Sequence, residues 1–443
     1  MKTVYIVSLG CPKNLVDTEV MFALLEQNGY SLSDLPAQAD VLLVNTCGFI
    51  RPAVEEAIDE LLRLAENKHE KAILIATGCM VQRYGRELAA ALPEVDIFLG
   101  LDQELMIIEA IETLKKKGAY STEVTASTYI MNVNVPRKLS TPFYRSFLKI
   151  TEGCDNHCTY CMIPAIRGNL RSRNINDLVA EAVILRGQGV QEVTLIAQDL
   201  CAYGDDFACS RYLVPLLQAL LDRTTIPWIR LLYLYPSSLP EELLQLMAEQ
   251  NRIVPYLDIP IQHTVDSVLK AMNRRYGYRQ LDRLINRIRT YLPDCALRTT
   301  IMVGFPGETD DDVARLLMAL EKWQFDHVGV FCYEDEEGTR AAQLSGKVLD
   351  DVKKIRYKKV METQAGISLN RQQRYVGRIE PVLVEGVSRE SDLLLEGRTR
   401  YQAPDIDGCV YINDGQAETG DIVQVLISEA HPYDLVGKVV DAP

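Results

Sequence analysis

Short apolar runs alternate with amphipathic stretches along most of this chain, and this alternation restricts the possible folds more than any other feature of the sequence. A strand followed by a helix and then by another strand builds a parallel sheet covered by helices. In the N-terminal part, the predicted strands are 3–10, 40–46 and 72–78, and the predicted helices are 14–29 and 53–67. Residues 1–120 are therefore predicted to form an α/β domain with a doubly wound parallel sheet.

The alternation resumes after residues 121–142, which show no clear period and are predicted to be a linker because they contain Pro136 and Pro142. The strands predicted beyond the linker are 146–152, 192–198, 228–235, 256–262, 297–305 and 327–334, and the helices are 175–189, 210–223, 240–250, 278–292 and 309–324. This pattern predicts a partial (β/α)6 barrel over residues 143–370. The chemistry of such barrels takes place at the carboxyl ends of the strands.

Residues 371–443 show short strand patterns separated by turn residues, which predicts a small C-terminal β-barrel. Its predicted strands are 378–387, 392–401, 408–414, 421–430 and 434–440. This segment has seven Lys and Arg against thirteen Asp and Glu, and the whole chain has a formal charge of −14. Such a surface repels phosphates, so a general nucleic-acid binder is disfavoured and a basic protein partner is favoured.

The length of 443 residues predicts several domains rather than one core. The sequence contains no apolar stretch long enough to cross a membrane and no signal-peptide pattern at its start, so we expect a cytoplasmic protein. Thiols stay reduced in that compartment. The eleven cysteines therefore indicate metal binding or catalysis before disulfides.

Three cysteines directly follow the three strands predicted in the N-terminal domain, and we call them the first trio: Cys11, Cys47 and Cys79. The carboxyl ends of parallel strands meet at one edge of a sheet, so the first trio is expected to converge there. Each cysteine has a neighbouring glycine that allows the backbone to approach a bulky ligand, namely Gly10, Gly48 and Gly78. The alternative is three small buried hydrophobes. Thiolates suit iron–sulfur clusters and zinc alike.

A second trio lies in "TEGCDNHCTYCMIPAIRG", residues 151–168, after the first predicted barrel strand: Cys154, Cys158 and Cys161. A structural zinc site needs a fourth ligand, for which the candidate is His157, although it would compete with Cys158 for space. A 4Fe–4S cluster held by three thiolates instead leaves one iron open to a small molecule.

The spacing C-x3-C-x2-C, with the aromatic residue Tyr160 before the third cysteine, resembles the signature of the radical S-adenosylmethionine superfamily. The resemblance implies that the methionyl amino and carboxylate groups of S-adenosylmethionine bind the open iron. An electron from the cluster then cleaves the sulfonium bond and forms a 5′-deoxyadenosyl radical.

A closer resemblance covers nearly the whole chain: the segments "SLGCPKNLVDTE", "NTCGFI", "TGC", "YLDIPIQH", "VGFPGET" and "EGRTRYQAPDIDG" look like those of the methylthiotransferases. It implies a cluster domain, a radical barrel and a C-terminal TRAM domain, with a second 4Fe–4S cluster on the first trio. One S-adenosylmethionine then methylates a sulfur there, and another supplies the radical that abstracts hydrogen from the substrate. An external sulfur source and electron donor are also implied.

Within this family the sequence is most similar to the branch that modifies the β-carbon of an aspartate in small-subunit ribosomal protein twelve. The acidic C-terminal barrel and the segment around Cys11 favour that branch. The alternatives are the branch that modifies a tRNA adenosine and, without any enzymatic activity, an electron carrier that bears clusters.

Further residues are expected to contact the cofactor: Tyr160, Gln198, Gly304, Gly307 and Glu308. The alternatives are core packing for Tyr160 and an ordinary glycine-rich turn for the last three. Three arginines that follow the cluster loop could meet an acidic group of the substrate or screen the charge of the cluster: Arg167, Arg171 and Arg173. The alternative is that they are solvated, as arginines on such a stretch more often are. Of the histidines, only His263 lies at a strand end. The remaining five cysteines have no ligand spacing: Cys201, Cys209, Cys295, Cys332 and Cys409. Of these, Cys295 and Cys332 are predicted to be buried thiols. Cys201 is predicted to lie near the mouth without binding metal.

Overall fold

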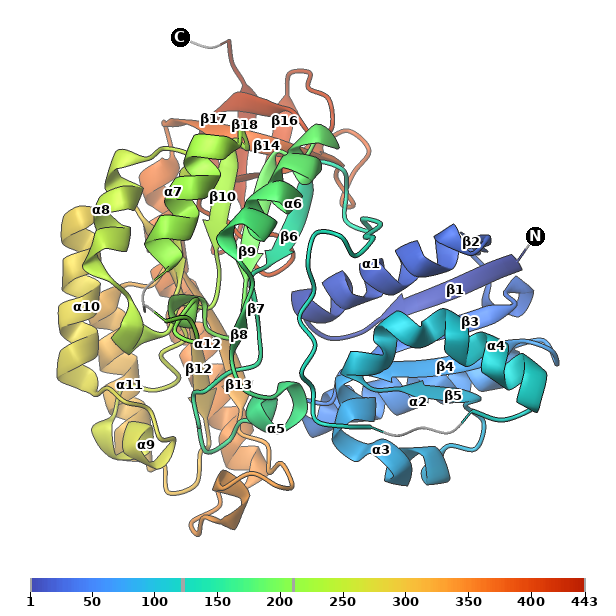
Figure 1. Cartoon of the computed structure of the whole chain (residues 1–443). Coiled ribbons are helices and arrows are strands. Elements are labelled where there is room, and N and C mark those ends of the chain that lie inside the picture. Colours follow the sequence, from blue (N-terminus) through green and yellow to red (C-terminus); the bar gives the residue numbers. More distant parts are fainter. Residues whose placement is uncertain (1, 121–123, 209–211, 442–443) are drawn as a thin grey trace.

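The computed structural model of the chain describes residues 2–120, 124–208 and 212–441 and builds them around three successive sheets (Figure 1). A five-stranded sheet has the order β2-β1-β3-β4-β5, a six-stranded sheet has the order β13-β12-β11-β10-β9-β6, and a closed barrel has the order β14-β15-β16-β18-β17. The predicted fold class, with two α/β units followed by a small β-barrel, is thus confirmed.

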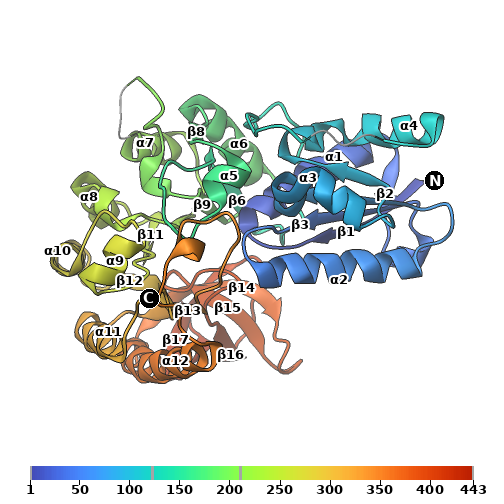
Figure 2. The same cartoon turned by 90° about the horizontal axis from the view of Figure 1, so that it is seen from below.

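All strand pairs in the N-terminal sheet are parallel. Its strands are β1 (Lys2–Ser8), β2 (Tyr30–Leu32), β3 (Val41–Thr46), β4 (Ile73–Gly78) and β5 (Ile97–Leu99), and its helices are α1 (Pro12–Gln27), α2 (Arg51–Asn67), α3 (Cys79–Ala91) and α4 (Ile107–Lys117). α1 and α4 share a core with one face of the sheet, and α2 and α3 share a core with the other. Figure 2 shows α2 on the side opposite α1 and α4.

The sequence patterns located β1, β3, β4, α1 and α2 but missed the other elements of this domain. β2 and β5 have three residues each, too few for a period. The pattern of α3 is interrupted by Gly85, whose φ is 51°.

The second sheet is also parallel and remains open, with β6 and β13 at its two edges. Its strands are β6 (Arg145–Lys149), β9 (Glu192–Ile196), β10 (Trp228–Leu231), β11 (Ile253–Asp258), β12 (Ala296–Val303) and β13 (His327–Cys332). The helices around it are α6 (Ile175–Gly187), α7 (Leu213–Arg223), α8 (Glu241–Glu249), α10 (Tyr278–Tyr291), α11 (Asp310–Trp323) and α12 (Asp350–Gln372). The partial barrel predicted from the sequence is therefore present. The long, polar α12 was not predicted.

The first predicted barrel strand is divided in two. β6 ends at Lys149, and the next two residues form β7 (Thr151–Glu152), which pairs antiparallel with β8 (Arg171–Ser172). This short ribbon closes the loop that carries the second trio. Two further helices at the mouth were not predicted, α5 (Ile163–Arg167) and α9 (Asp266–Ala271).

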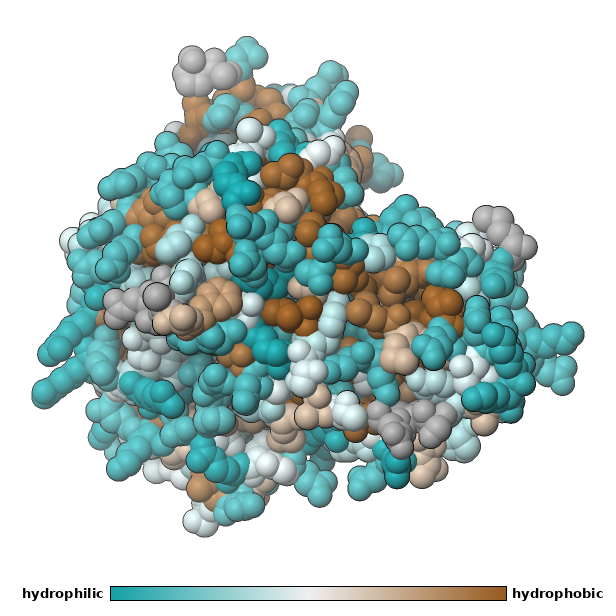
Figure 3. Space-filling view, in the orientation of Figure 1, coloured by the Kyte–Doolittle hydropathy of each residue, from teal (hydrophilic) through white to brown (hydrophobic). Residues whose placement is uncertain are grey.

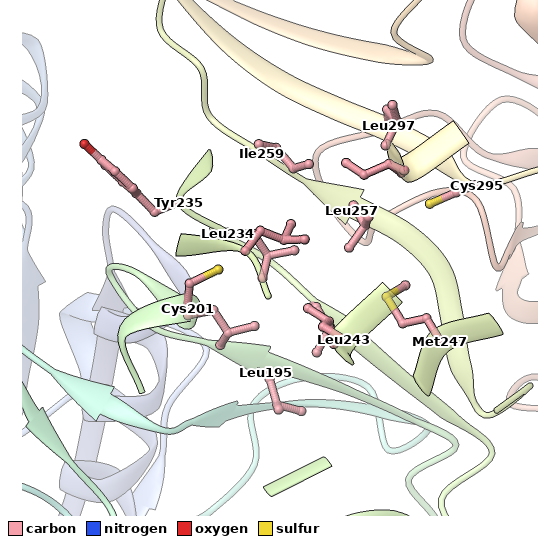
Figure 4. Packing of buried hydrophobic residues seen from close by; sticks show 14 of the residues in the cluster. Leu195, Cys201, Leu234, Tyr235, Leu243, Met247, Leu257, Ile259, Cys295 and Leu297 are labelled. Atoms are coloured by element: carbon pink, nitrogen blue, oxygen red, sulfur yellow. The ribbon is translucent and has the colours of Figure 1, made fainter. Parts of the chain in front are cut away.

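The core of the barrel lies between the sheet and its surrounding helices. It includes Leu195 of β9, Leu257 of β11 and Leu243 of α8. Figure 4 shows the sulfur atoms of Cys201 and Cys295 among these aliphatic side chains. Both thiols therefore serve as core residues.

Residues 124–142 contain no helix or strand, yet they pack between the two α/β units. Arg137 forms ion pairs with Glu19 of α1 at 2.7 Å and with Glu181 of α6 at 2.6 Å. This part of the predicted linker therefore joins both units by buried charges. The boundaries of 121 and 142 stay a prediction.

The C-terminal barrel consists of β14 (Ile379–Val387), β15 (Leu395–Thr399), β16 (Val410–Asp414), β17 (Ile422–Ala430) and β18 (Leu435–Val439), which are the five predicted strands. It packs against the second sheet through a shared apolar cluster that includes Trp228 and Tyr256. Within the described ranges, no helix is long and apolar enough to span a bilayer. The face seen in Figure 3 is mainly hydrophilic, with apolar patches over α6 and α1.

Candidate functional site

The first trio lies at the carboxyl edge of the N-terminal sheet. Cys47 follows the last residue of β3, Cys79 is the first residue of α3 directly after β4, and Cys11 precedes α1. The charges of Cys11 and Cys47 both act on the Cys79 thiol. The convergence expected from the topology is therefore observed.

Glycines bring the three loops of the first trio into contact. A Cβ at Gly10 would lie 2.9 Å from Cys47 Cβ, and a Cβ at Gly48 would lie 2.7 Å from the Cys79 backbone. Gly10 has a φ of 92°, which side-chain-bearing residues rarely adopt. In this chain the glycines are thus required for the close approach of the loops to one another.

The second trio also gathers, in the loop between β7 and α5. The thiols of Cys154 and Cys158 both act electrostatically on that of Cys161. Backbone N–H groups point at two of the sulfur atoms, since Asn156 N lies 3.4 Å from Cys154 Sγ and Ile163 N lies 3.4 Å from Cys161 Sγ. Hydrogen bonds of this kind favour a thiolate.

Arg167, the last residue of α5, connects the two trios. It lies only six residues after Cys161 of the second trio, and its Nε donates to Cys79 Sγ of the first trio at 3.3 Å. The same guanidinium donates to Asn14 Oδ1 at 2.6 Å and to Glu152 Oε1 at 2.7 Å. The expectation that this arginine is solvated is wrong, because α5 packs against α3 and buries it completely.

Arg173 is likewise buried, and it pairs with Asp177 and Glu181. Arg171 is half-buried and donates to backbone carbonyls, including that of Tyr129. Neither is a freely solvated side chain, so the expectation fails for all three arginines. The predicted linker packs on β8, since Arg171 also donates to Ser127 Oγ.

Buried carboxylates surround Arg167. Asp17 and Glu152 both pair with it and with Lys149 of β6. Burial would raise the pKa of the Glu152 carboxyl, but Arg167 and Lys149 together lower it. The Glu152 carboxyl therefore remains ionised within the interface between the two units.

A second buried arginine, Arg274, contacts the second trio. Arg274 Nη1 lies 3.4 Å from Cys158 Sγ, and its guanidinium carbon lies 4.3 Å from the centre of the Tyr235 ring. Each trio thus has one guanidinium directed at one of its sulfur atoms. Sequence patterns did not indicate Arg274, which lies more than a hundred residues from the cysteines that it meets.

The thiols differ in their electrostatic surroundings. Burial would raise the pKa of Cys11, but Lys13 and Arg167 together lower it. Burial raises the pKa of Cys79 to about 12 and that of Cys161 to about 12. A metal that binds these sulfur atoms must therefore displace protons from well-shielded thiols.

Gln198 lies where β9 opens into the mouth. Both polar atoms of its amide are buried and have no hydrogen-bond partner among the described residues. Unpaired buried amides are rare, because they lose their hydrogen bonds to water. The next residue, Asp199, accepts from Asn156 Nδ2 in the loop of the second trio at 2.7 Å, and burial raises the pKa of this carboxyl to about 6.

Tyr160 packs half-buried against a small apolar cluster that contains Phe305 of "GFPGE". In that motif Glu308 Oε1 accepts from Gly304 N at 2.9 Å and from Arg356 Nη1 at 2.8 Å, so it stabilises the turn. Its other oxygen lies 3.6 Å from Nε2 of the buried His263. Gly307 has a φ of 84° and open space where a Cβ would be. Tyr160 and the "GFPGE" turn therefore share one apolar cluster, while part of Glu308 is engaged in the fold.

His157 is exposed, and within the described part of the chain the hydrogen bonds that it accepts go to its backbone carbonyl. Across the described ranges, no set of three or more His, Cys, Asp or Glu side chains is arranged to hold a metal ion. A zinc ion requires its ligands around one centre, whereas a cluster binds each thiolate to a different iron. The donor set of two cysteine trios therefore fits clusters better than zinc.

Of the other cysteines, Cys295 is buried as predicted, and Cys201, predicted only to lie near the mouth without binding metal, is also buried. Cys332 is only half-buried, which differs from the prediction, because it ends an edge strand. Cys409 lies 3.6 Å from Asp434 Oδ1 in the C-terminal barrel, and Cys209 lies outside the described residues.

Comparison with known proteins agrees with this arrangement. Residues 3–100 match an uncharacterized protein family, UPF0004, residues 148–320 match the radical SAM superfamily, and residues 376–440 match the TRAM domain. The chain is 51% identical over 439 residues to "Ribosomal protein uS12 methylthiotransferase RimO" of Desulfotalea psychrophila, covering 98% of this chain and 99% of that protein. A relative of the same name from Citrifermentans bemidjiense is 47% identical over 440 residues, which are 99% of this chain and 98% of the relative.

This chain belongs to the RimO family of methylthiotransferases.

The RimO family lies within the radical SAM superfamily, so this chain is an enzyme whose chemistry involves a 4Fe–4S cluster and S-adenosylmethionine. Among solved structures, the radical S-adenosylmethionine methyltransferase TsrM from Kitasatospora setae has a TM-score of 0.55 at 16% identity, over 75% of both chains. The cobalamin-dependent enzyme OxsB has a TM-score of 0.52 at 14% identity, over 83% of this chain and 56% of that one. These likenesses concern the fold alone.

Several residues of this RimO-family site were missed from the sequence: Lys13, Asn14, Asp17, Glu152, Asn156 and Arg274. Lys13, Asn14 and Asp17 fall within "SLGCPKNLVDTE", the segment that carried the family resemblance. That segment offered a signal, because its polar residues occupy the first turns of a helix directly after Cys11. No such pattern marks Arg274.

Proposed function

We propose that this chain transfers a methylthio group to the β-carbon of an aspartate in ribosomal protein uS12, and that it does so with two 4Fe–4S clusters. In this proposal the second trio holds the cluster whose open iron takes S-adenosylmethionine, and the first trio holds the other. The names of the RimO relatives support uS12 as the substrate. The formal charge of −14 supports a basic protein partner.

The observation that carries this proposal is the short connection between the two trios. α5 begins two residues after Cys161, and its last residue donates to Cys79 Sγ at 3.3 Å. A sulfur atom can be delivered to a carbon radical only if both lie in the same cavity. A five-residue helix that begins beside the second trio and ends in contact with the first trio supports this requirement.

When bound, the clusters and S-adenosylmethionine supply the electron and the radical that remove hydrogen from an unactivated carbon. The chain provides the surroundings. In this proposal the Gln198 amide forms hydrogen bonds with the methionyl part of the cofactor, since it has no partner among the described residues. Gly304, Gly307 and Glu308 line the adenosine side, and Tyr160 packs beside it. Arg167 and Arg274 donate to cysteine sulfur atoms and offset negative charge.

The sulfur source and the electron donor are proposed to come from outside the chain. We also expect the open iron on each cluster to make the enzyme sensitive to oxygen.

Iron counting after anaerobic reconstitution tests the two clusters. The wild-type chain should bind about twice as much iron as a variant with Cys11, Cys47 and Cys79 all changed to alanine, and about twice as much as the corresponding variant of the second trio. Cys332→Ala, which alters a half-buried thiol outside both trios, is the control and should keep all of the iron. Full iron in either triple variant contradicts the assignment.

Product analysis tests the reaction. With S-adenosylmethionine and dithionite, a uS12 peptide should gain the mass of one sulfur plus one CH2 unit on its aspartate. A modified tRNA adenosine in place of a modified peptide would instead indicate the tRNA-acting branch. Reversible reduction without consumption of S-adenosylmethionine would indicate an electron carrier.

A further inference from the structure

Lys13 is a buried lysine that extends from the N-terminal domain into the mouth of the barrel. It lies in the first turn of α1, two residues after Cys11, and its side chain is almost entirely buried. Its Nζ donates to the carbonyl oxygen of Ala197 at 3.1 Å and lies 4.0 Å from the centre of the Tyr233 ring. The ammonium group therefore sits between the loop of the first trio and the end of β9.

Among the residues that the structure describes, this cation has no carboxylate partner. The other buried lysines and arginines in the described part of the chain pair with Asp or Glu, with the single further exception of Arg274. Arg274 directs its guanidinium at Cys158 Sγ, Tyr276 and the Pro260 carbonyl. Lys13 has three N–H groups and, among described residues, one oxygen acceptor. A buried, unpaired ammonium is costly to the fold, so its presence points to a task.

The surroundings of Lys13 show other features of a binding site. The residue after Ala197 is Gln198, whose buried amide is also without a partner. Tyr233 has a φ of 65°, although tyrosine rarely adopts the left-handed region, and its N–H is held by Asp258 at 3.1 Å. Strained backbone and unsatisfied polar groups gather at sites that receive a ligand.

We propose that Lys13 binds the side-chain carboxylate of the substrate aspartate, an inference that rests on the proposed function. The carboxylate carbon is bonded directly to the β-carbon that reacts, so the group that holds the carboxylate must lie beside the reacting position. Lys13 lies between the loop of the first trio and the end of β9, and Asp199, two residues after Ala197, accepts from Asn156 in the loop of the second trio. Two of the Lys13 N–H groups have no acceptor among the described residues. An ammonium paired with a carboxylate also rejects asparagine, because a neutral amide leaves the charge unpaired.

A different role for Lys13 would be to offset the negative charge of the first trio alone, since its charge also acts on Cys11 and Cys79. That role does not depend on what the substrate carries. The preference of the enzyme between aspartate and asparagine separates the two roles.

The test uses the full chain, reconstituted anaerobically, and two uS12 peptides that differ only in Asp or Asn at the modified position. Two ratios are measured on each preparation: kcat/KM for the Asp peptide over the Asn peptide, and the ratio of their dissociation constants without reductant, when no turnover occurs. Because each is a ratio on one preparation, incomplete cluster assembly cancels. The variants are Lys13→Met and Lys13→Arg. The control is Lys2→Met, which alters an exposed lysine at the first residue of β1, the end of the strand opposite Cys11.

Lys13→Met should lower kcat/KM for the Asp peptide roughly 10- to 100-fold, as expected for the loss of a charge-assisted pair, and should bring both ratios close to one. Lys13→Arg should keep a clear preference for Asp, and Lys2→Met should match the wild type. An unchanged preference in Lys13→Met overturns the inference while leaving the proposed function intact. A wild-type enzyme that modifies neither peptide overturns the proposed function itself.

Discussion

At the scale of single residues, the interface between the two trios depends on Arg167. This side chain pairs with Asp17 and Glu152 and donates to Asn14 and to Cys79 Sγ, all within a buried region. These contacts come from three segments of the chain, α1, α3 and β7. Loss of the guanidinium therefore removes one centre that several segments share.

Arg167→Gln is expected to destabilise the cluster-free chain by about 3–5 kcal/mol, because it leaves the buried Asp17 and Glu152 with only Lys149 as a cation partner among the described residues. Arg167→Lys should recover part of this loss, since it keeps the charge but not the fork of donors. The free energy of unfolding in urea measures the effect.

Arg171→Gln is the matched control, four residues further along the chain. Arg171 donates to backbone carbonyls, is half-buried and forms no ion pair within the described residues, so its loss should cost about 1 kcal/mol or less. Equal effects for the two arginines would contradict the special position of Arg167.

At the scale of elements, the turn between β4 and α3 fixes the position of Cys79. Gly78 has a φ of 96°, and a Cβ there would lie 2.1 Å from Asn45 Oδ1 and 2.6 Å from the carbonyl oxygen of Thr46. No rotation of a side chain can relieve the second of these contacts. The turn therefore requires glycine.

Gly78→Ala should destabilise the cluster-free chain by roughly 2–4 kcal/mol and should also lower the iron bound by the first trio, while the second trio keeps its iron. Gly118→Ala is the control, because Gly118 also has a positive φ, of 73°, but no atom lies within 4 Å of the added Cβ. Its expected cost is about 1 kcal/mol. Chemical unfolding and iron counting measure both effects, and similar costs for the two variants would contradict the steric argument.

The same turn illustrates what sequence patterns can predict. Period and turn residues located the long strands and helices and placed the cysteines at strand ends, because these features depend on local spacing. β2 and β5 are too short to show a period, and α12 has few buried positions in a long polar sequence. Arg167 was misjudged because its burial depends on the packing of α5 against α3. Arg274 was missed because its burial depends on the approach of distant loops to the mouth.

At the scale of the whole molecule, buried ion pairs join units that the chain connects only once. Arg83 of α3 pairs with Glu336, beyond β13, at 2.9 Å, which fastens the N-terminal domain to the barrel. Glu192, at the start of β9, pairs with Arg230 of β10 and with Arg398 of β15. These ion pairs of Glu192 join the C-terminal barrel to the second sheet. They lie at the start of the strands, far from either trio.

Glu192 makes this attachment dependent on pH. Burial would raise the pKa of its carboxyl, but Arg230 and Arg398 lower it to about 2. A folded pKa below the unfolded value of about 4.3 means that the ion pair stabilises the fold fully above about pH 4.3 and loses its effect as the pH falls toward 2. The contribution lost is about 3 kcal/mol.

We therefore expect the C-terminal barrel to detach from the second sheet in this acidic range. Trp228 lies in the apolar cluster between the two, and the chain has two tryptophans, so in Trp323→Phe the tryptophan emission comes from Trp228 alone. Its emission should shift to the red between about pH 4 and 2.

In Glu192→Gln, which leaves two buried arginines without their carboxylate, the shift should already be present at neutral pH. Asp405→Asn removes only an exposed partner of Arg145, at 2.7 Å, and should leave the transition unchanged, because exposed pairs contribute about 1 kcal/mol or less. Identical acid transitions in Glu192→Gln and the parent would show that another group controls the attachment.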